Sequence, residues 1–119
     1  MKEYDLGVIN ANVENMLIQA QQGLEKAIQE YGEAVDVYGD SIVTYRKAKA
    51  EAVRRLKANG TAVTIIQDLA AGEVAEHKAE MVKAEGKMKR IRMLVDAYIE
   101  RINGIKYIGR RTDDLANKG

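Results

Sequence analysis

The sequence contains no cysteine, proline, tryptophan or phenylalanine among its 119 residues. Without cysteine the chain can form neither a disulfide nor a thiolate metal site, which fits a reducing cytoplasm. Without proline it lacks the residue that most strongly interrupts helices. The six tyrosines are the only aromatic residues, so we do not expect a large globular core.

Long apolar runs are also missing. No stretch approaches the roughly 18 apolar residues that a membrane span needs. The first residues include Lys2, Glu3 and Asp5, which do not fit a secretory leader. We therefore expect no membrane partner and a cytoplasmic location.

Charge is nearly balanced at net +1, but it is arranged in blocks of alternating sign. Residues 1–45 carry two basic and eight acidic side chains, and residues 46–60 carry six basic and one acidic. Residues 61–80 carry one basic and four acidic side chains, and residues 81–111 carry nine basic and three acidic. Folding back near residue 61 places opposite blocks side by side, whereas the wrong pairing sets like beside like. We interpret the blocks first as control of helix register and orientation.

A 4-3 hydrophobic repeat predicts a long first helix over about residues 8–58. Its larger members are Leu17, Leu24, Tyr31, Tyr38, Tyr45 and Ala52, and its smaller members are Val13, Ala20, Ala27, Ala34, Ser41 and Ala48. A repeat of this length is typical of a coiled-coil seam. Ile28, Val35 and Ile42 widen the apolar stripe, which favours more than one partner helix.

Three glycines interrupt this helical pattern: Gly23, Gly32 and Gly39. Each costs about 1 kcal/mol relative to alanine in a helix interior. They indicate either close helix contact or local softness.

A turn is predicted over residues 59–64. Asn59-Gly60 is a helix stop signal, because glycine tolerates the left-handed conformation that ends helices. Thr64 and Gln67 then match a capping box that would start the next helix.

The repeat resumes after the turn and predicts a second helix over about residues 65–110, with a frayed tail at 112–119. Gly72 is a candidate kink, or a boundary between a short first piece and a longer second one. Leu94, Ile99 and Ile108 flank the repeat. Its members are Val74, His77, Met81, Ala84, Met88, Ile91, Val95, Tyr98, Ile102 and Ile105.

Two helices of similar length joined by a short turn predict an all-α, coiled-coil-like antiparallel hairpin, forming a single domain over residues 1–119. A lone hairpin leaves the flanking apolar residues exposed, so we expect a homo-oligomer such as a four-helix bundle or a larger assembly. Whether the hairpin is closed or swapped between chains stays open. The residues expected at the seam and in oligomer contacts are Leu17, Leu24, Tyr31, Tyr38, Tyr45, Met81, Met88, Ile91, Val95, Tyr98 and Ile102.

Few residues could carry catalysis or bind a metal. Ser41 is the only serine, His77 is the only histidine, and both fall in the repeat. His77 has Glu73 nearby, but the di-metal pattern of helical bundles needs Glu three residues before His, and here the spacing is four. A histidine that sets register or titrates on partner binding is the alternative we favour. Phosphate-binding glycine loops are absent. We expect no enzyme, no metal and no cofactor.

Basic residues on the outer sides of both helices are candidate nucleic-acid contacts, because phosphate binding needs such a stripe. A solvated face that pairs with the opposite helix is the alternative. The candidates are Arg46, Lys47, Arg54, Lys83, Lys89, Arg90, Arg110 and Arg111.

The middle of the chain resembles a known group. The run Gly60-x-x-Val63-Thr64-x-Ile66-x-Asp68-Leu69-Ala70-x-Gly72, then Glu73-Val74-Ala75 and a long helix with Ala97-x-x-x-x-Ile102-Asn103, is similar to small helical proteins of phages and prophages of Gram-positive bacteria. These are encoded among early genes for replication and recombination, and the similarity covers roughly residues 45–108. The resemblance implies a cytoplasmic accessory protein in a bacterial host, working near DNA metabolism.

Two functions follow as expectations. The first is a non-enzymatic structural or protein-interaction module, a helical oligomer that docks a phage or host protein. The alternative is a basic nucleic-acid-binding accessory factor in phage replication or recombination.

Overall fold

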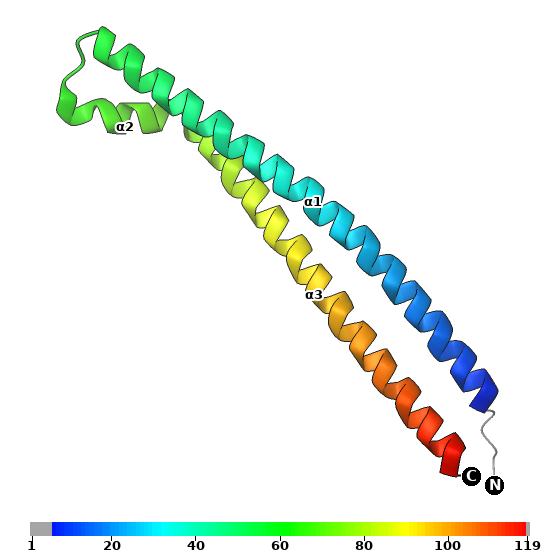
Figure 1. The fold of residues 1–119 in the computed structure, drawn as a ribbon. Helices are drawn as coiled ribbons and strands as arrows, with labels where there is room; N and C mark the ends of the chain where they lie inside the picture. The colour runs from blue at the N-terminus through cyan, green and yellow to red at the C-terminus, as the bar shows by residue number, and fades with distance from the viewer. Residues whose placement is uncertain (1–5, 119) are drawn as a thin grey trace. The chain divides into compact units, whose positions relative to one another are not determined.

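The computed structural model of the protein describes residues 6–118, which form three α-helices (Figure 1). These are α1 (Leu6–Ala58), α2 (Val63–Glu73) and α3 (Ala75–Lys118). The predicted all-α class is confirmed, since two long helices are present and no strand occurs among the described residues. No helix in this part of the chain combines the length and the hydropathy that crossing a lipid bilayer requires.

Contacts between residues divide the chain into two compact units. The terminal unit combines the part of α1 up to Glu30 with the part of α3 from Ile91. The turn unit is Tyr31–Arg90, with the rest of α1, all of α2 and the beginning of α3. The heptad pattern continues through both units, which is why the sequence predicts one domain. Each unit has its own cluster of buried side chains.

In the terminal unit, α1 and α3 run antiparallel. Val13 lies beside Gly109, whereas Gly23, farther along α1, lies beside Tyr98, which comes earlier in α3. Residue numbers therefore rise along one helix as they fall along the other. This direction lets the two apolar edges meet over their length.

The core of the terminal unit is small and is built around Ala20. Ala20 is 2% exposed, and Ile102 and Ile105 of α3 are 8% and 3% exposed in the same cluster. A small residue on α1 lets the branched side chains of α3 come close, and each isoleucine so buried contributes on the order of 1.5–3 kcal/mol. Three further residues pack against this cluster: Val13, Leu17 and Leu24.

Close helix contact explains one of the three glycines in the first helix, and not the other two. A Cβ atom on Gly23 would lie 2.6 Å from Cζ of Tyr98, whereas one on Gly32 or Gly39 would meet nothing within 4 Å.

We expect Gly32→Ala and Gly39→Ala each to raise the free energy of unfolding of the monomeric chain by about 0.5–1 kcal/mol. Gly23→Ala is expected not to raise the free energy of unfolding, because the Tyr98 ring must move to make room for the added Cβ atom. Urea unfolding followed by circular dichroism checks this, and three equal gains would contradict it.

The core of the turn unit joins three segments of the chain. Ala52 and Leu56 of α1 are buried with Ile66 and Ala70 of α2, and with Val74, which follows α2. Ala70 is 0% exposed and Ile66 is 2% exposed, so the inner face of α2 is fully covered. Partly buried apolar residues of α1 surround this cluster: Tyr45, Ala48 and Val53.

The end of α1 has the hydrogen-bond pattern that glycine favours. Gly60 adopts a left-handed conformation with φ 78°. Its N–H donates to the carbonyl of Lys57 at 3.1 Å, and the N–H of Thr61 donates to the carbonyl of Leu56 at 3.1 Å. This pair of bonds is a Schellman motif, which satisfies two carbonyl groups that the last helical turn leaves without partners.

The predicted cap at Thr64 is wrong. α2 begins at Val63, its N-cap residue is Ala62, and no side chain caps the helix. Ala62 is extended, with φ −59° and ψ 132°, and its carbonyl accepts a bond of 3.1 Å from the N–H of Ile65. Thr64 therefore lies inside the first turn, C-terminal to the N-cap position, and its hydroxyl cannot serve as the N-cap. A threonine followed by Gln67 was not sufficient to fix the boundary.

A break at Val74, shortly after Gly72, separates α2 from α3. Val74 has φ −104° and ψ 15°. Its N–H still bonds the carbonyl of Ala70 at 3.1 Å, and its carbonyl accepts from the N–H of Lys78 at 3.0 Å. Val74 is buried, while His77, which the repeat placed in the seam, is exposed together with the rest of residues 75–80. The predicted repeat holds again from Met81, which is half-buried, and Ala84, which is buried.

α3 continues as helix to Lys118, beyond the point where the hydrophobic pattern weakens. Thr112 is 6% exposed, and its hydroxyl donates to the carbonyl of Ile108 at 2.9 Å. The sequence predicts fraying over residues 112–119. The described part of this segment is helical instead, and it contains no glycine or proline that would end a helix. Gly119 lies outside the described residues.

Candidate functional site

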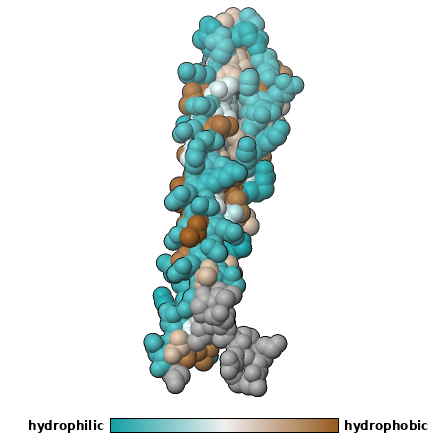
Figure 2. All heavy atoms as spheres, turned by 90° about the vertical axis from the view of Figure 1, so that its right-hand side faces the viewer, coloured by the Kyte–Doolittle hydropathy of each residue, from teal (hydrophilic) through white to brown (hydrophobic). Residues whose placement is uncertain are grey.

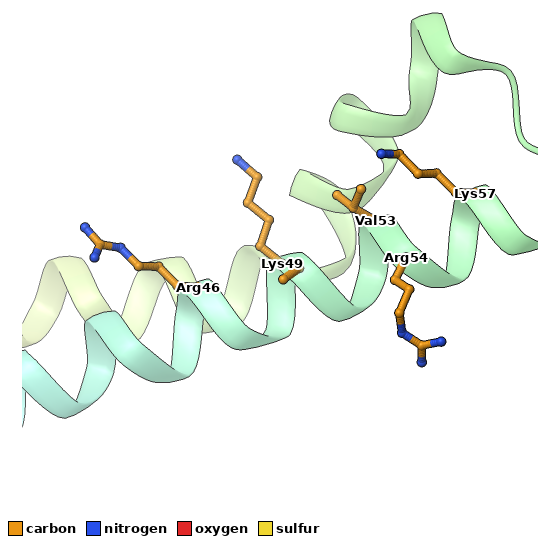
Figure 3. A pocket seen from close by; sticks show the side chains of 6 residues that line it. Arg46, Lys49, Val53, Arg54 and Lys57 are labelled. Carbon is orange, nitrogen blue, oxygen red and sulfur yellow. The ribbon is translucent and has the colours of Figure 1, made fainter.

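A hollow along one side of α1 in the turn unit combines four cations with an apolar floor. We call it the basic groove, and its volume is about 510 Å³. Arg46, Lys49 and Lys57 project to one side of α1, whereas Arg54 projects to the opposite side (Figure 3). The backbone positions of the lining residues recur at intervals of three and four, so these residues border one hollow although the side chain of Arg54 turns away from the other three cations. The lining residues are Arg46, Lys49, Ala50, Val53, Arg54 and Lys57.

One of these cations is compensated locally. The guanidinium of Arg54 donates to Glu51 at 2.6 and 3.1 Å, and this hydrogen bond, with the attraction between the charges, raises the pKa of Arg54 and lowers the pKa of Glu51. Both groups are exposed, so the pair adds little stability. Within the described part of the chain, Arg46, Lys49 and Lys57 form no ion pair. The groove therefore keeps a net positive charge.

A second hollow lies between α1 and α3 in the turn unit, with a volume of about 240 Å³. It brings Lys83 and Arg90, two predicted phosphate contacts, together with Lys87. Glu80 also lines it and partly offsets their charge. The remaining lining residues are Val37, Ser41 and Ala84.

The predicted phosphate contact Lys89 is engaged by a neighbour. Its ammonium lies 2.7 Å from the carboxylate of Glu85, which also accepts a hydrogen bond of 2.8 Å from the hydroxyl of Tyr38. The bond from Lys89, and then that from Tyr38, lower the pKa of Glu85, while the bond to Glu85 raises the pKa values of Tyr38 and Lys89. A phosphate at this lysine would have to compete with Glu85.

The other predicted phosphate contacts do not join a single site. Lys47 is exposed and lines neither hollow, and Arg110 and Arg111 are exposed in the terminal unit.

The sequence prediction missed two cations of the basic groove, Lys49 and Lys57. Their spacing from Arg46 places them on the same helical face, so a projection around the helix would have found them.

The predicted seam residues face inward within the chain. Tyr31, Tyr38 and Tyr45 of α1 are half-buried. Contacts to a second copy must therefore involve other residues as well. The remaining seam residues are half-buried or buried too: Leu17, Leu24, Met81, Met88, Ile91, Val95, Tyr98 and Ile102.

The outer face of α2 is a second candidate surface. Ile65 and Leu69 are 47% and 45% exposed, although Ile66 and Ala70 beside them are buried. Val63, at the start of the helix, is 83% exposed. Ile65 and Leu69 are one turn apart, so they lie side by side on one face. Val63 is displaced by about 160° from Ile65 and about 120° from Leu69 around the helix, so it lies on another side. We define the α2 outer face as Ile65 and Leu69.

Elsewhere, exposed apolar side chains are more dispersed. On the face shown in Figure 2, hydrophobic side chains lie singly among hydrophilic ones. Single exposed apolar residues are normal on protein surfaces and need no partner. Three exposed apolar side chains within the short helix α2 are therefore more informative about a binding surface than the single ones elsewhere.

His77 lies in a shallow hollow of about 260 Å³, near Glu51 and Glu73. Glu73 is engaged by the guanidinium of Arg55 in an ion pair. Among the described residues, no three histidine, aspartate or glutamate side chains gather closely enough to hold a metal ion.

No protein-family model matches the sequence, and comparisons with curated proteins and with solved structures find no match. The resemblance to phage and prophage proteins stays a hypothesis based on the turn segment. Two surfaces of the turn unit are therefore the candidates for function: the basic groove and the α2 outer face.

Proposed function

We propose that the protein is a non-enzymatic helical interaction module, which binds other helices through the α2 outer face. The observation that supports this is that α2 is apolar on two sides. Ile66 and Ala70 fill the core of the turn unit, whereas Ile65 and Leu69 point away from it and stay about half exposed. Apolar residues around a helix are typical of one that is covered on more than one side.

The partner in this proposal is a second copy of the chain or a helix of another protein. A homo-oligomer such as a four-helix bundle would cover the outer face and complete the coiled-coil-like arrangement that the heptads predict. The resemblance of the turn segment would place a further partner in the phage or its bacterial host. Burying what remains exposed of Ile65 and Leu69 would contribute on the order of 1 kcal/mol for each side chain.

The double variant Ile65→Ser/Leu69→Ser tests this proposal. We expect its dissociation constant for self-association to rise roughly 30-fold, because about 2 kcal/mol of apolar contact is lost. Sedimentation velocity over a micromolar concentration range measures the change. Circular dichroism verifies that the helices remain.

A matched control replaces exposed apolar residues outside α2. Val82→Ser/Met93→Ser removes side chains that are 57% and 70% exposed on α3. This variant is expected to associate like the unmodified chain. A chain that is monomeric at every concentration would contradict the proposed self-association, and equal weakening in both double variants would remove the special role of α2.

Nucleic-acid binding is the second candidate function. The observation in its favour is that the basic groove and the second hollow, both in the turn unit, are rich in lysine and arginine. Arg46, Lys49 and Lys57 have no ion-pair partner among the described residues, so no carboxylate competes with a phosphate for them. The ammonium of Lys49 lies over the Tyr45 ring, 6.0 Å from its centroid. Contacts to phosphates position a nucleic acid without reading its sequence.

Neutralising Arg46, Lys49 and Lys57 with glutamine tests this candidate. If each contacts one phosphate of single-stranded DNA, the slope of log affinity against log salt should fall in magnitude by about 2. Fluorescence anisotropy with a labelled oligonucleotide measures this slope. Arg92→Gln/Arg101→Gln in the terminal unit is the control. An unchanged slope in the groove variant would exclude the groove as the binding surface.

A further inference from the structure

The outward side of α1 in the turn unit carries opposite charges in its two halves. The acidic half holds Glu33, Asp36 and Asp40, all exposed, and no lysine or arginine occurs between Tyr31 and Tyr45. The basic half follows directly and includes part of the basic groove. We call the two halves together the α1 stripe, and it consists of Glu33, Asp36, Asp40, Val43, Arg46, Lys47, Ala50, Arg54 and Lys57.

The stripe points away from the intrachain contacts. In the heptad repeat its members occupy positions on the side opposite the half-buried tyrosines and buried alanines. All of them are exposed, and Val43, at the boundary between the halves, is 49% exposed. Nothing in the turn unit therefore covers this side of α1.

The charges of the stripe are not used to hold the three helices together. Among the described residues, one ion pair joins α1 to another helix, and it is formed by Arg55 and Glu73, outside the stripe. Arg54 pairs with Glu51 of its own helix. Glu33, Asp36 and Asp40 form no ion pair in this part of the chain. Ion pairs among the described residues therefore leave the acidic half of the stripe without a partner.

We propose that a second copy of this chain covers the α1 stripe, with the two α1 helices antiparallel about a twofold axis near Val43. In this arrangement Asp40 of each copy lies opposite Arg46 of the other, and Glu33 lies next to Arg54 of the other. A parallel arrangement would set acidic beside acidic and basic beside basic. The surface is self-complementary, as a twofold contact requires. This inference rests on the proposed self-association and adds a second contact surface to the α2 outer face.

The apolar residues of the stripe fit the same arrangement. Val43 of one copy meets Val43 of the other at the axis. Gly39 lies opposite Lys47, and with no Cβ at that position there is room for the aliphatic stem of the lysine. The α2 outer face is not part of this contact, and in the proposed self-association it makes a separate contact of its own.

Two charge-reversal variants test the stripe. One carries Glu33→Lys, Asp36→Lys and Asp40→Lys, which makes the stripe positive throughout. The other carries Arg46→Glu, Lys47→Glu and Arg54→Glu, which makes it predominantly negative. Each alone is expected to self-associate at least about tenfold more weakly than the unmodified chain at low salt. An equimolar mixture is expected to form a one-to-one heterodimer, seen by native mass spectrometry and sedimentation velocity.

The control variant Glu14→Lys/Asp96→Lys/Glu100→Lys changes charge equally at exposed positions outside the stripe. It should associate like the unmodified chain. Circular dichroism establishes that every variant is helical, and heterodimer formation shows that both reversed chains fold.

Several outcomes overturn the inference and are distinguishable. If either reversed variant self-associates unchanged, or if the mixture gives no heterodimer, the stripe is not the interface, while the proposed interaction module stands. If the unmodified chain is monomeric at every concentration, the proposed self-association fails as well. If it is monomeric and binds DNA, and Arg46→Glu/Lys47→Glu/Arg54→Glu loses that binding, the occupant is a nucleic acid.

Discussion

Replacing Ile66 with alanine is expected to lower the free energy of unfolding by about 2–4 kcal/mol. Ile66 is 2% exposed and lies in the turn-unit core with Leu56, Ala70 and Val74. Truncation removes apolar contacts and leaves a cavity. The cavity cannot collapse easily, because α2 is held at one end by the turn at Gly60 and at the other by the junction at Val74.

Urea unfolding at concentrations where the chain is monomeric measures this loss. Val82→Ala is the matched control, because Val82 is 57% exposed in the same unit, on α3. Its effect should stay within about 0.5 kcal/mol, as is usual for surface substitutions. A loss below about 1 kcal/mol for Ile66→Ala would mean that α2 is not packed on α1 as described.

Much of the fold could be predicted because the evidence for it is periodic and local. Every seventh residue from Ala20 through Ala27 to Ala34 is buried, and the tyrosines beside them are half-buried. A chain without proline gives few alternatives to long helices. The left-handed glycine at position 60 ends α1 where the Asn59-Gly60 pair suggests a stop.

The junction between α2 and α3 was less predictable, because it depends on one irregular backbone residue. Val74 interrupts the helix, and the residues that follow it, 75–80, are all exposed, including His77. A heptad count identifies the inward residues again from Met81, but it does not show which residues beside the break lie outside the seam. The same applies to Thr64, where the extended Ala62 decides the start of α2.

The candidate surfaces were likewise only partly predictable from the sequence. The basic side of α1 was visible in the sequence as Arg46, Lys47 and Arg54, but the groove also needs Lys49 and Lys57. The α2 outer face could not be recognised, because an exposed Ile65 has meaning only once Ile66 is known to be buried. Both surfaces depend on how a helix is rotated about its own axis, which is determined by tertiary packing.

Replacing Ile105 with alanine is the corresponding experiment in the terminal unit, with an expected loss of about 2–3 kcal/mol. Ile105 is 3% exposed and packs with Ala20 and Ile102. Only two helices form this core, so they can approach each other and fill part of the cavity, which favours the lower part of the range. Ile108→Ala is the control because Ile108, one turn along α3, is 48% exposed.

The double variant Ile66→Ala/Ile105→Ala tests whether the two cores contribute independently to the free energy of unfolding. The two residues belong to separate clusters and share no packing partner, so their losses should add to within about 0.5 kcal/mol. Hydrogen exchange should locate each loss, with Ile105→Ala accelerating the amides around Ile102 and leaving those around Ala70 unchanged. Acceleration in both places by either substitution would mean that the clusters open as one cooperative unit, because only shared opening would expose amides far from the cavity.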